Sequence, residues 1–509
     1  MASATAQRVA RNTLWFTMGS ILQKGISFVY FTVVAMAFGV TGTGRYFFAL
    51  TFTALFAMVA DWGISAMLTR EIAKDRAVGE RLIVPAFLMK GGFALATGVL
   101  ITVLARAFGY PAETRMMVAL ATVVLLLDSI HLGCYGILRG LQRVHYEASG
   151  LVIGQAVLTI VGGSILFLRG GLSLSNIPGA PPLTLTRTLA PIWLLVPYVC
   201  TSIVNITIAA IGMIRERVRM VWAPSEWRDR IRRMLHMATP FALAGILARV
   251  YTYSDTFLLS ILAVESAVGF YSTPFKIAFA FQFIPLAFMG ALYPAMSAVA
   301  NRSREELRSL FEQSLRALFA VALPISVGIA ILAPRIITEL YGAAFAPSII
   351  PLTILAVSIP FVFANFPAGN LLNATDRQSW NTILVGIATA VNLLANVLLI
   401  PPYAVIGAAV SALIGSVALT IANAVLAHRV IAYRLRIVGR ALLRTLLACV
   451  VMGIVLLMLP SAPLLAAVAV GGVVYAGAAF SFRAIQHSDI RELLAYFRST
   501  PTPPAPEIV

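Results

Sequence analysis

The sequence predicts an all-α, polytopic membrane protein with about 14 transmembrane helices. Hydrophobic residues make up 60% of the 509 residues and charged residues only 11%, too few charges to cover a water-soluble protein of this size. The apolar residues are gathered in fourteen stretches, most of 19 to 27 residues. Since about 20 helical residues span the hydrocarbon core and backbone groups in lipid must bond within the segment, each stretch is predicted to be a helix.

Turn residues and charges between the apolar stretches set the expected ends of the helices. The predicted spans are residues 14–38, 46–68, 82–105, 116–138, 148–168, 189–214, 237–262, 270–298, 315–332, 349–372, 381–400, 404–426, 441–459 and 464–482. The first span follows a basic start and resembles a signal peptide. Its apolar run is too long for that, so we expect it to be retained as a helix.

The arginines predict how the chain is oriented in the membrane. With the N-terminus placed in the cytoplasm, 28 of the 38 lysine and arginine residues fall in segments on the cytoplasmic side. This asymmetry follows the positive-inside rule, so both termini are expected in the cytoplasm. The net charge of +18 is spread over eight separate segments, which argues against a nucleic-acid-binding surface.

An internal repeat predicts two lobes of six helices each. Positions 225 apart match in the first hairpin of each half: Gly44 with Gly269, Tyr46 with Tyr271, and Lys24 with Arg249. The predicted organisation is an N-terminal lobe (1–214), a cytoplasmic linker (215–236), a C-terminal lobe (237–427), two additional helices (428–482) and a cytoplasmic tail (483–509). Because six is even, both lobes enter the membrane in the same orientation.

The segments outside the spans are short. The linker contains seven arginines together with Trp222 and Ser225, which predicts a short interfacial helix capped by Ser225. A similar short helix is expected over 488–497. The loop over 169–190 on the outer side is too short to form a domain.

The sequence contains no motif for the common membrane enzymes. It has no Gly-Lys-Ser/Thr loop for ATP, no His-Glu-x-x-His and no Gly-x-Ser-x-Gly. Its three cysteines, Cys134, Cys200 and Cys449, lie within predicted spans and suggest neither a disulfide nor a metal site. We therefore expect a transporter without a cofactor and not an enzyme.

Charged residues within the spans are the candidate functional residues. Each costs about 2.5 to 3.5 kcal/mol at the middle of the bilayer, so it is expected to be paired or to face water. Counting from the nearest turn places Lys24 level with Asp61, Lys90 level with Asp128, and Asp255 level with Lys276, so these are the predicted ion pairs, with Asp255 and Lys276 direct neighbours. Arg249 is left over.

Two readings of these charges remain open. In the first they are buried ion pairs that only orient helices, which we favour for Lys90 and Asp128. In the second, Arg249 and its counterpart Lys24 bind a phosphate-bearing headgroup in a cavity. His131 lies three residues after Asp128, on the same helix face, and is either a proton relay or a histidine hydrogen-bonded to its neighbours.

Several short motifs are found in the two halves of the chain. They are Gly44-Arg45-Tyr46-Phe47, Asp61-Trp62-Gly63, Leu68-Thr69-Arg70-Glu71-Ile72-Ala73, Tyr253-Ser254-Asp255, Val268-Gly269-Phe270-Tyr271 and Lys276-Ile277. In these motifs the chain resembles the oligosaccharide and polysaccharide flippases of the multidrug/oligosaccharidyl-lipid/polysaccharide exporter superfamily. The resemblance implies two lobes around a cationic cavity and movement of polyprenyl-diphosphate-linked oligosaccharide from the cytoplasmic to the outer leaflet by alternating access. It also implies cavity cations at Lys24, Arg249 and Lys276, with Asp255 as their partner.

The resemblance leaves several functions in competition. A flippase of lipid-linked peptidoglycan precursor shares fourteen helices with the polysaccharide flippases. A drug/cation antiporter needs a carboxylate in its first lobe and an anionic cavity, whereas the first span here offers Lys24 and no acid. A membrane scaffold or polymerase of envelope assembly is disfavoured by the lack of a long outer loop. We expect a multi-pass protein of the bacterial inner membrane with membrane lipids and envelope polysaccharide assembly proteins as partners.

Overall fold

The computed structural model describes residues 2–174, 183–222 and 227–484, and almost all of them are α-helical. Twelve helices are long and apolar enough to cross a membrane. Two of these contain a kink: α1 (Ala2–Asp61) at Gly39, with φ 62°, and α12 (Gln378–Ile431) at Ala404, with φ 46°. Since each of these two helices is long enough to cross twice, the described residues contain fourteen spans, the number that the sequence predicts.

The remaining elements are short or single-span helices and one β-hairpin. Strands β1 (Leu172–Leu174) and β2 (Leu183–Leu185) pair antiparallel in the loop after α5. The helices are α2 (Ile64–Lys74), α3 (Arg76–Ala107), α4 (Ala112–Gly140), α5 (His145–Leu168), η1 (Pro191–Leu195), α6 (Val196–Arg215), α7 (Trp227–Leu262), α8 (Glu265–Ala280), α9 (Phe283–Val299), α10 (Arg304–Tyr341), η3 (Ala343–Ser348), α11 (Ile349–Ala374), α13 (Leu435–Leu457) and α14 (Leu464–Ser481).

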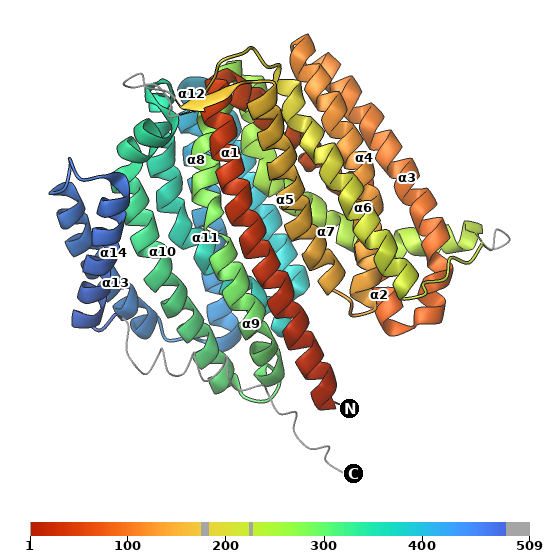
Figure 1. Ribbon diagram of the computed structural model, residues 1–509. Helices are drawn as coiled ribbons and strands as arrows, with labels where there is room; N and C mark the ends of the chain where they lie inside the picture. The colour runs from red at the N-terminus through yellow and green to blue at the C-terminus, as the bar shows by residue number, and fades with distance from the viewer. Residues whose placement is uncertain (1, 175–182, 223–226, 485–509) are drawn as a thin grey trace. The chain divides into compact units, whose positions relative to one another are not determined.

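The chain forms two compact units, and the first holds most of the predicted charged residues. It comprises residues 18–273 and 396–408. Within it α3, α4 and α6 lie side by side (Figure 1). The core is formed by α2, α4 and α7, where Met67, Ile137 and Ala238 are fully buried. The first unit therefore includes α7.

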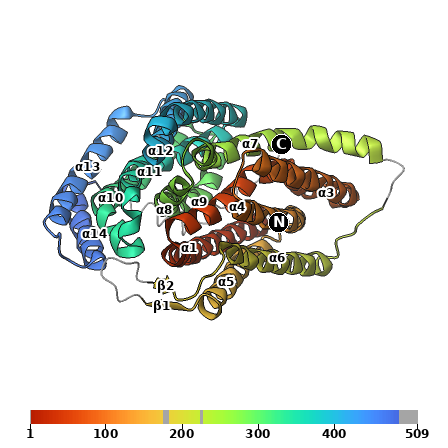
Figure 2. The ribbon, with the colours of Figure 1, turned by 90° about the horizontal axis from the view of Figure 1, so that it is seen from above.

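In the second unit α10 is the central helix. This unit contains residues 274–395 and the chain from 409 onward, together with the first 17 residues. Helices α13 and α14 pack against α10 in both ribbon views (Figure 1 and Figure 2). Two contacts fix them: the Tyr475 hydroxyl donates to the Ala320 carbonyl at 2.5 Å, and Arg434 pairs with the buried Glu312 at 3.0 Å. The two additional helices are thus attached by buried contacts.

The predicted span 46–68 is wrong at its C-terminal end, because the helix breaks at Trp62 and Gly63. Gly63 has φ 71°, and a side chain there would overlap the backbone of α7 at Ala238 and Ala242. The Asp61 carboxylate accepts a hydrogen bond from the Ser65 N–H at 3.3 Å and so occupies the start of α2. Close packing of α7 therefore requires a glycine turn that the apolar pattern does not indicate.

The predicted span 270–298 is also interrupted, since α8 ends at Ala280 and α9 begins at Phe283. Pro285 lies in the first turn of α9, where its missing N–H is not needed. Its ring would clash with the carbonyl of residue 281 in a continuous helix, and the break occurs there. The proline thus divides this span into two shorter helices.

The linker does not contain a separate helix from Trp227 onward, which corrects the prediction. Residue 227 is the first residue of α7, which continues to Leu262. Met234 and Ala238 lie one turn apart and are both fully buried, so the same helix face packs into the core before and after the predicted boundary. Ser225 and the helix expected over 488–497 lie outside the described residues. The lobe boundaries remain a prediction.

Replacing Gly269 with alanine is expected to destabilise the first unit by about 1–3 kcal/mol. A methyl group at Gly269 would overlap the Val40 carbonyl oxygen, which is backbone and cannot rotate away. Thermal unfolding in detergent measures the effect. Gly25→Ala is the matched control, because a methyl group there meets no atom within 4 Å. Equal melting temperatures for the two variants would contradict this close approach.

Candidate functional site

Three polar clusters lie within the spans of the first unit, and each is built around one carboxylate. The clusters are centred on Asp61 at the end of α1, Asp128 in α4 and Asp255 in α7. All three acids are among the candidates from the sequence. The partners of Asp61 and Asp128 differ from those that the depth of each residue in the membrane predicts.

The first cluster joins Asp61 to Lys90 on α3, so the predicted pairing of Lys90 with Asp128 is wrong. The Lys90 ammonium contacts the Asp61 carboxylate directly and donates to the Ser65 hydroxyl at 2.8 Å. Ser65 in turn donates to Asp61 at 2.5 Å. Lys90 is 1% exposed. The turn at Gly63 brings Asp61 toward α3, which is why the neighbouring acid on α4 is not used.

The second cluster contains Asp128 without a lysine or arginine. The Ser202 hydroxyl of α6 donates to Asp128 Oδ1 at 2.6 Å, and His131 Nδ1 lies 3.5 Å from the same oxygen. Within the part of the chain that the structure describes, Asp128 forms no ion pair with a lysine or arginine. The predicted position of His131 on the same face as Asp128 is confirmed.

The third cluster surrounds Asp255, which is 4% exposed. The Tyr271 hydroxyl of α8 donates to Oδ2 at 3.0 Å, and the Asn396 amide of α12 donates to Oδ1 at 2.6 Å. Lys276 is half-buried and lies in the part of α8 that belongs to the second unit. The ion pair between Lys276 and Asp255 stays a prediction.

Sequence reasoning missed the neutral members of these clusters. Ser65, Ser202 and Asn396 carry no charge, so they do not stand out among residues counted for their cost in the membrane. One signal was present for Asn396: it lies one helical turn after Asn392 in an otherwise apolar run. Two amides on one helix face in the membrane indicate a polar contact.

Lys24 and Arg249 differ from the other charged residues within spans. Neither forms an ion pair with any residue in 2–174, 183–222 and 227–484. The predicted ion pair between Lys24 and Asp61 is therefore also wrong. Lys24 on α1 is exposed, and Arg249 on α7 is half-buried with its guanidinium 5.9 Å from the Tyr253 ring. An arginine at that distance from an aromatic face retains all its hydrogen-bond donors for a ligand.

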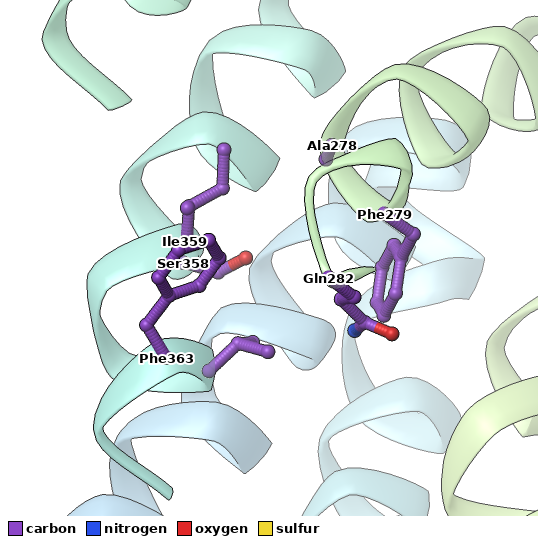
Figure 3. A pocket seen from close by; sticks show the side chains of 7 residues that line it. Ala278, Phe279, Gln282, Ser358, Ile359 and Phe363 are labelled. Atoms are coloured by element: carbon purple, nitrogen blue, oxygen red, sulfur yellow. The ribbon is translucent and has the colours of Figure 1, made fainter. Parts of the chain in front are cut away.

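A small cavity lies within the second unit, between α8 and α11 (Figure 3). Gln282, Ser358 and Phe363 are among the residues that line it. Even with open solvent included, its empty space is only about 200 Å³, less than the roughly 300 Å³ at which pockets for drug-sized ligands start. The cavity is too small for a lipid-linked oligosaccharide and has no charged lining residue.

Comparison with known families identifies two matching sequence models. The model of the polysaccharide biosynthesis protein family matches residues 9–300. The model of the lipid II flippase MurJ family matches residues 186–470. Together the two matches cover all but the ends of the chain.

Two curated relatives come from Haloferax volcanii. The probable low-salt glycan biosynthesis flippase is 21% identical over 79% of this chain and 80% of its own length. The probable flippase AglR is 27% identical over 38% of each chain.

Solved structures share the fold. The lipid II flippase MurJ in an inward closed conformation superposes with a TM-score of 0.74 at 14% identity, covering 92% of this chain and 99% of that one. An inward-facing multidrug resistance transporter has a TM-score of 0.63 at 15% identity, covering 83% and 98%. The polytopic fold and the matching family models agree with the resemblance found in the sequence. The chain therefore belongs to the polysaccharide biosynthesis protein family, a flippase family of the multidrug/oligosaccharidyl-lipid/polysaccharide exporter superfamily.

Proposed function

We propose that this protein moves polyprenyl-diphosphate-linked oligosaccharide, such as a repeat unit of a surface polysaccharide, from the cytoplasmic to the outer leaflet by alternating access. The family match and the relative named as a probable low-salt glycan biosynthesis flippase support the substrate class. The protein carries the substrate without chemical change and is not an enzyme. It requires no cofactor.

The observation that carries this proposal is that Lys24 and Arg249 form no ion pair with a carboxylate of the described residues. Charge within a span is costly and is kept where it has a use. These two cations have no carboxylate partner within the described residues, so they are available to an anionic ligand. A diphosphate supplies the opposite charge and the acceptor oxygens that a guanidinium binds best. We propose Lys276 as a third substrate-binding cation.

The location follows from the distribution of charge. We propose the bacterial inner membrane, with both termini in the cytoplasm, because the arginine-rich segments then lie on the cytoplasmic side. Envelope polysaccharide assembly proteins, which would use the oligosaccharide on the outer side of that membrane, are the proposed partners.

Two other transport functions remain as alternatives. A lipid-linked peptidoglycan precursor also carries a diphosphate, and the match to the lipid II flippase family over 186–470 favours it. A drug/cation antiporter is less well supported, because a cationic drug would be repelled by Lys24 and Arg249.

Deletion of the gene with leaflet-resolved analysis of lipid-linked sugars tests the function. The expected result is build-up of a lipid-linked oligosaccharide on the cytoplasmic face. Build-up of the peptidoglycan precursor instead identifies the first alternative. Unchanged amounts in both leaflets, together with altered drug sensitivity, would contradict the flippase and support the antiporter.

A further inference from the structure

Asp128 is a carboxylate near the middle of α4 whose charge is not balanced by a fixed cation. Lys90, on the neighbouring helix α3, is bound to Asp61 and Ser65 instead. Ser202, which is 1% exposed, stabilises Asp128 with one neutral hydrogen bond. A carboxylate within a span that lacks a lysine or arginine partner is stabilised when it binds a proton or a cation.

His131 supplies an acceptor for that proton. The residue is 9% exposed, and its Nδ1 has no hydrogen-bond partner within the described residues. This nitrogen points toward Asp128 Oδ1 at 3.5 Å. A buried ring nitrogen without a partner carries a desolvation cost of the kind that binding a proton between the two groups removes.

The site is both held in place and accessible. His131 packs edge-on against Tyr135, with ring centroids 5.5 Å apart, and Tyr135 is fixed by a hydrogen bond to Asn205 at 2.8 Å. The Asp128 side chain, by contrast, is 41% exposed. The imidazole is therefore rigid, while one face of the carboxylate is open for proton exchange.

We propose that Asp128, His131 and Ser202 form a proton-binding site that couples proton movement to transport. One proton binds to the Asp128 carboxylate and forms a hydrogen bond to His131 Nδ1. No electrons move and no other bond breaks; the proton enters from one side of the membrane and leaves to the other. Binding itself does not depend on the proposed flippase function, whereas coupling rests on it.

Other titratable groups on the elements around α4 are already engaged. Those that face α4 are Lys90 of α3, paired with Asp61 at the end of α1; Glu147 of α5, paired with Arg139; Tyr198 of α6, bonded to Tyr46; and Glu71 of α2, paired with Lys74. Lys90 also approaches this part of α4, since its Cε lies beside Gly133, two residues after His131. A proton at Asp128 is thus not exchanged with a second free acid.

Sodium is the competing ligand, and the donor set disfavours it. Hard cations of this kind prefer several oxygen ligands. The site offers the Asp128 carboxylate, one hydroxyl and an imidazole nitrogen. Nitrogen suits a proton better, so we assign the site to a proton.

Infrared difference spectroscopy of the purified full-length protein in lipid tests binding without any transport substrate. Spectra at about pH 5 and about pH 8 are expected to show a carboxylic acid C=O band that is absent in Asp128→Asn and shifted in His131→Gln and Ser202→Ala. The matched control is Thr207→Ala, because that α6 hydroxyl bonds only its own helix backbone. A band that persists unchanged in Asp128→Asn would overturn the proposal.

Two further measurements complete the test. In proteoliposomes, a pH gradient is expected to drive uptake of a polyprenyl-diphosphate-linked probe at least tenfold better in the parent protein than in Asp128→Asn.

The melting temperature in sodium chloride is expected to equal that in potassium chloride at the same ionic strength. If sodium raises the melting temperature of the parent protein but not that of Asp128→Asn, the site binds sodium and the proton assignment is overturned. If the infrared band behaves as expected but the parent moves no probe, the proton site stands and the flippase function fails.

Discussion

Arg249→Ala is expected to abolish export of surface polysaccharide, while Arg249→Lys retains part of it. Arg249 has no ion pair among the described residues, so its charge is free to bind the diphosphate. Removing one partner of a desolvated charge pair costs about 2–5 kcal/mol, and 2 kcal/mol is already roughly a 30-fold loss of affinity. Lysine keeps the charge but not the two parallel hydrogen bonds of a guanidinium.

The measurement needs membrane abundance and lipid-linked substrate from the same cells, because an unstable protein would also stop export. Arg436→Ala is the matched control, since this arginine is exposed near the start of α13, outside the predicted binding residues. Lys24→Ala is expected to act in the same direction as Arg249→Ala. Normal abundance with normal export in Arg249→Ala would remove Arg249 from the substrate-binding residues.

The spans could be predicted from the sequence because their cause is local. An apolar run of sufficient length must form a helix in lipid, whatever surrounds it. The breaks at Gly63 and before Pro285 have different causes. A proline disrupts the helix that contains it, so the break before Pro285 can be predicted from the sequence. The break at Gly63 depends on how closely α7 approaches, and this information is not local.

The identity of the charged residues was predictable, whereas their pairing was not. Counting from a turn gives depth in the membrane, but contact also depends on which way each helix face is rotated. Lys90 is level with Asp128 by this count, yet the turn after Asp61 directs it to that acid instead. Asp128 is left with a serine and a histidine, which gives it chemistry that an ion pair would not have.

Lys90→Met is expected to destabilise the protein by about 3–5 kcal/mol, the cost of leaving a buried charge without its partner. The Lys90 side chain is 2% exposed and that of Asp61 15%, so water cannot replace the lost contact. Asp61→Asn alone is expected to cost a similar amount, because it leaves the ammonium uncompensated. The double variant should regain most of the loss, since it leaves no charge behind.

Unfolding in detergent can be followed with a thiol-reactive dye, because Cys134 and Cys449 are buried and react only when the fold opens. Lys74→Met is the matched control: its pair with Glu71 has a half-exposed lysine and is expected to contribute less than about 1 kcal/mol. Equal losses for Lys74→Met and Lys90→Met would contradict a special cost at Lys90. The double variant then decides between the two readings of the pair. If it is stable and exports polysaccharide, Asp61 and Lys90 serve to hold α1 and α3 together; if it is stable and does not export, the charges themselves take part in transport.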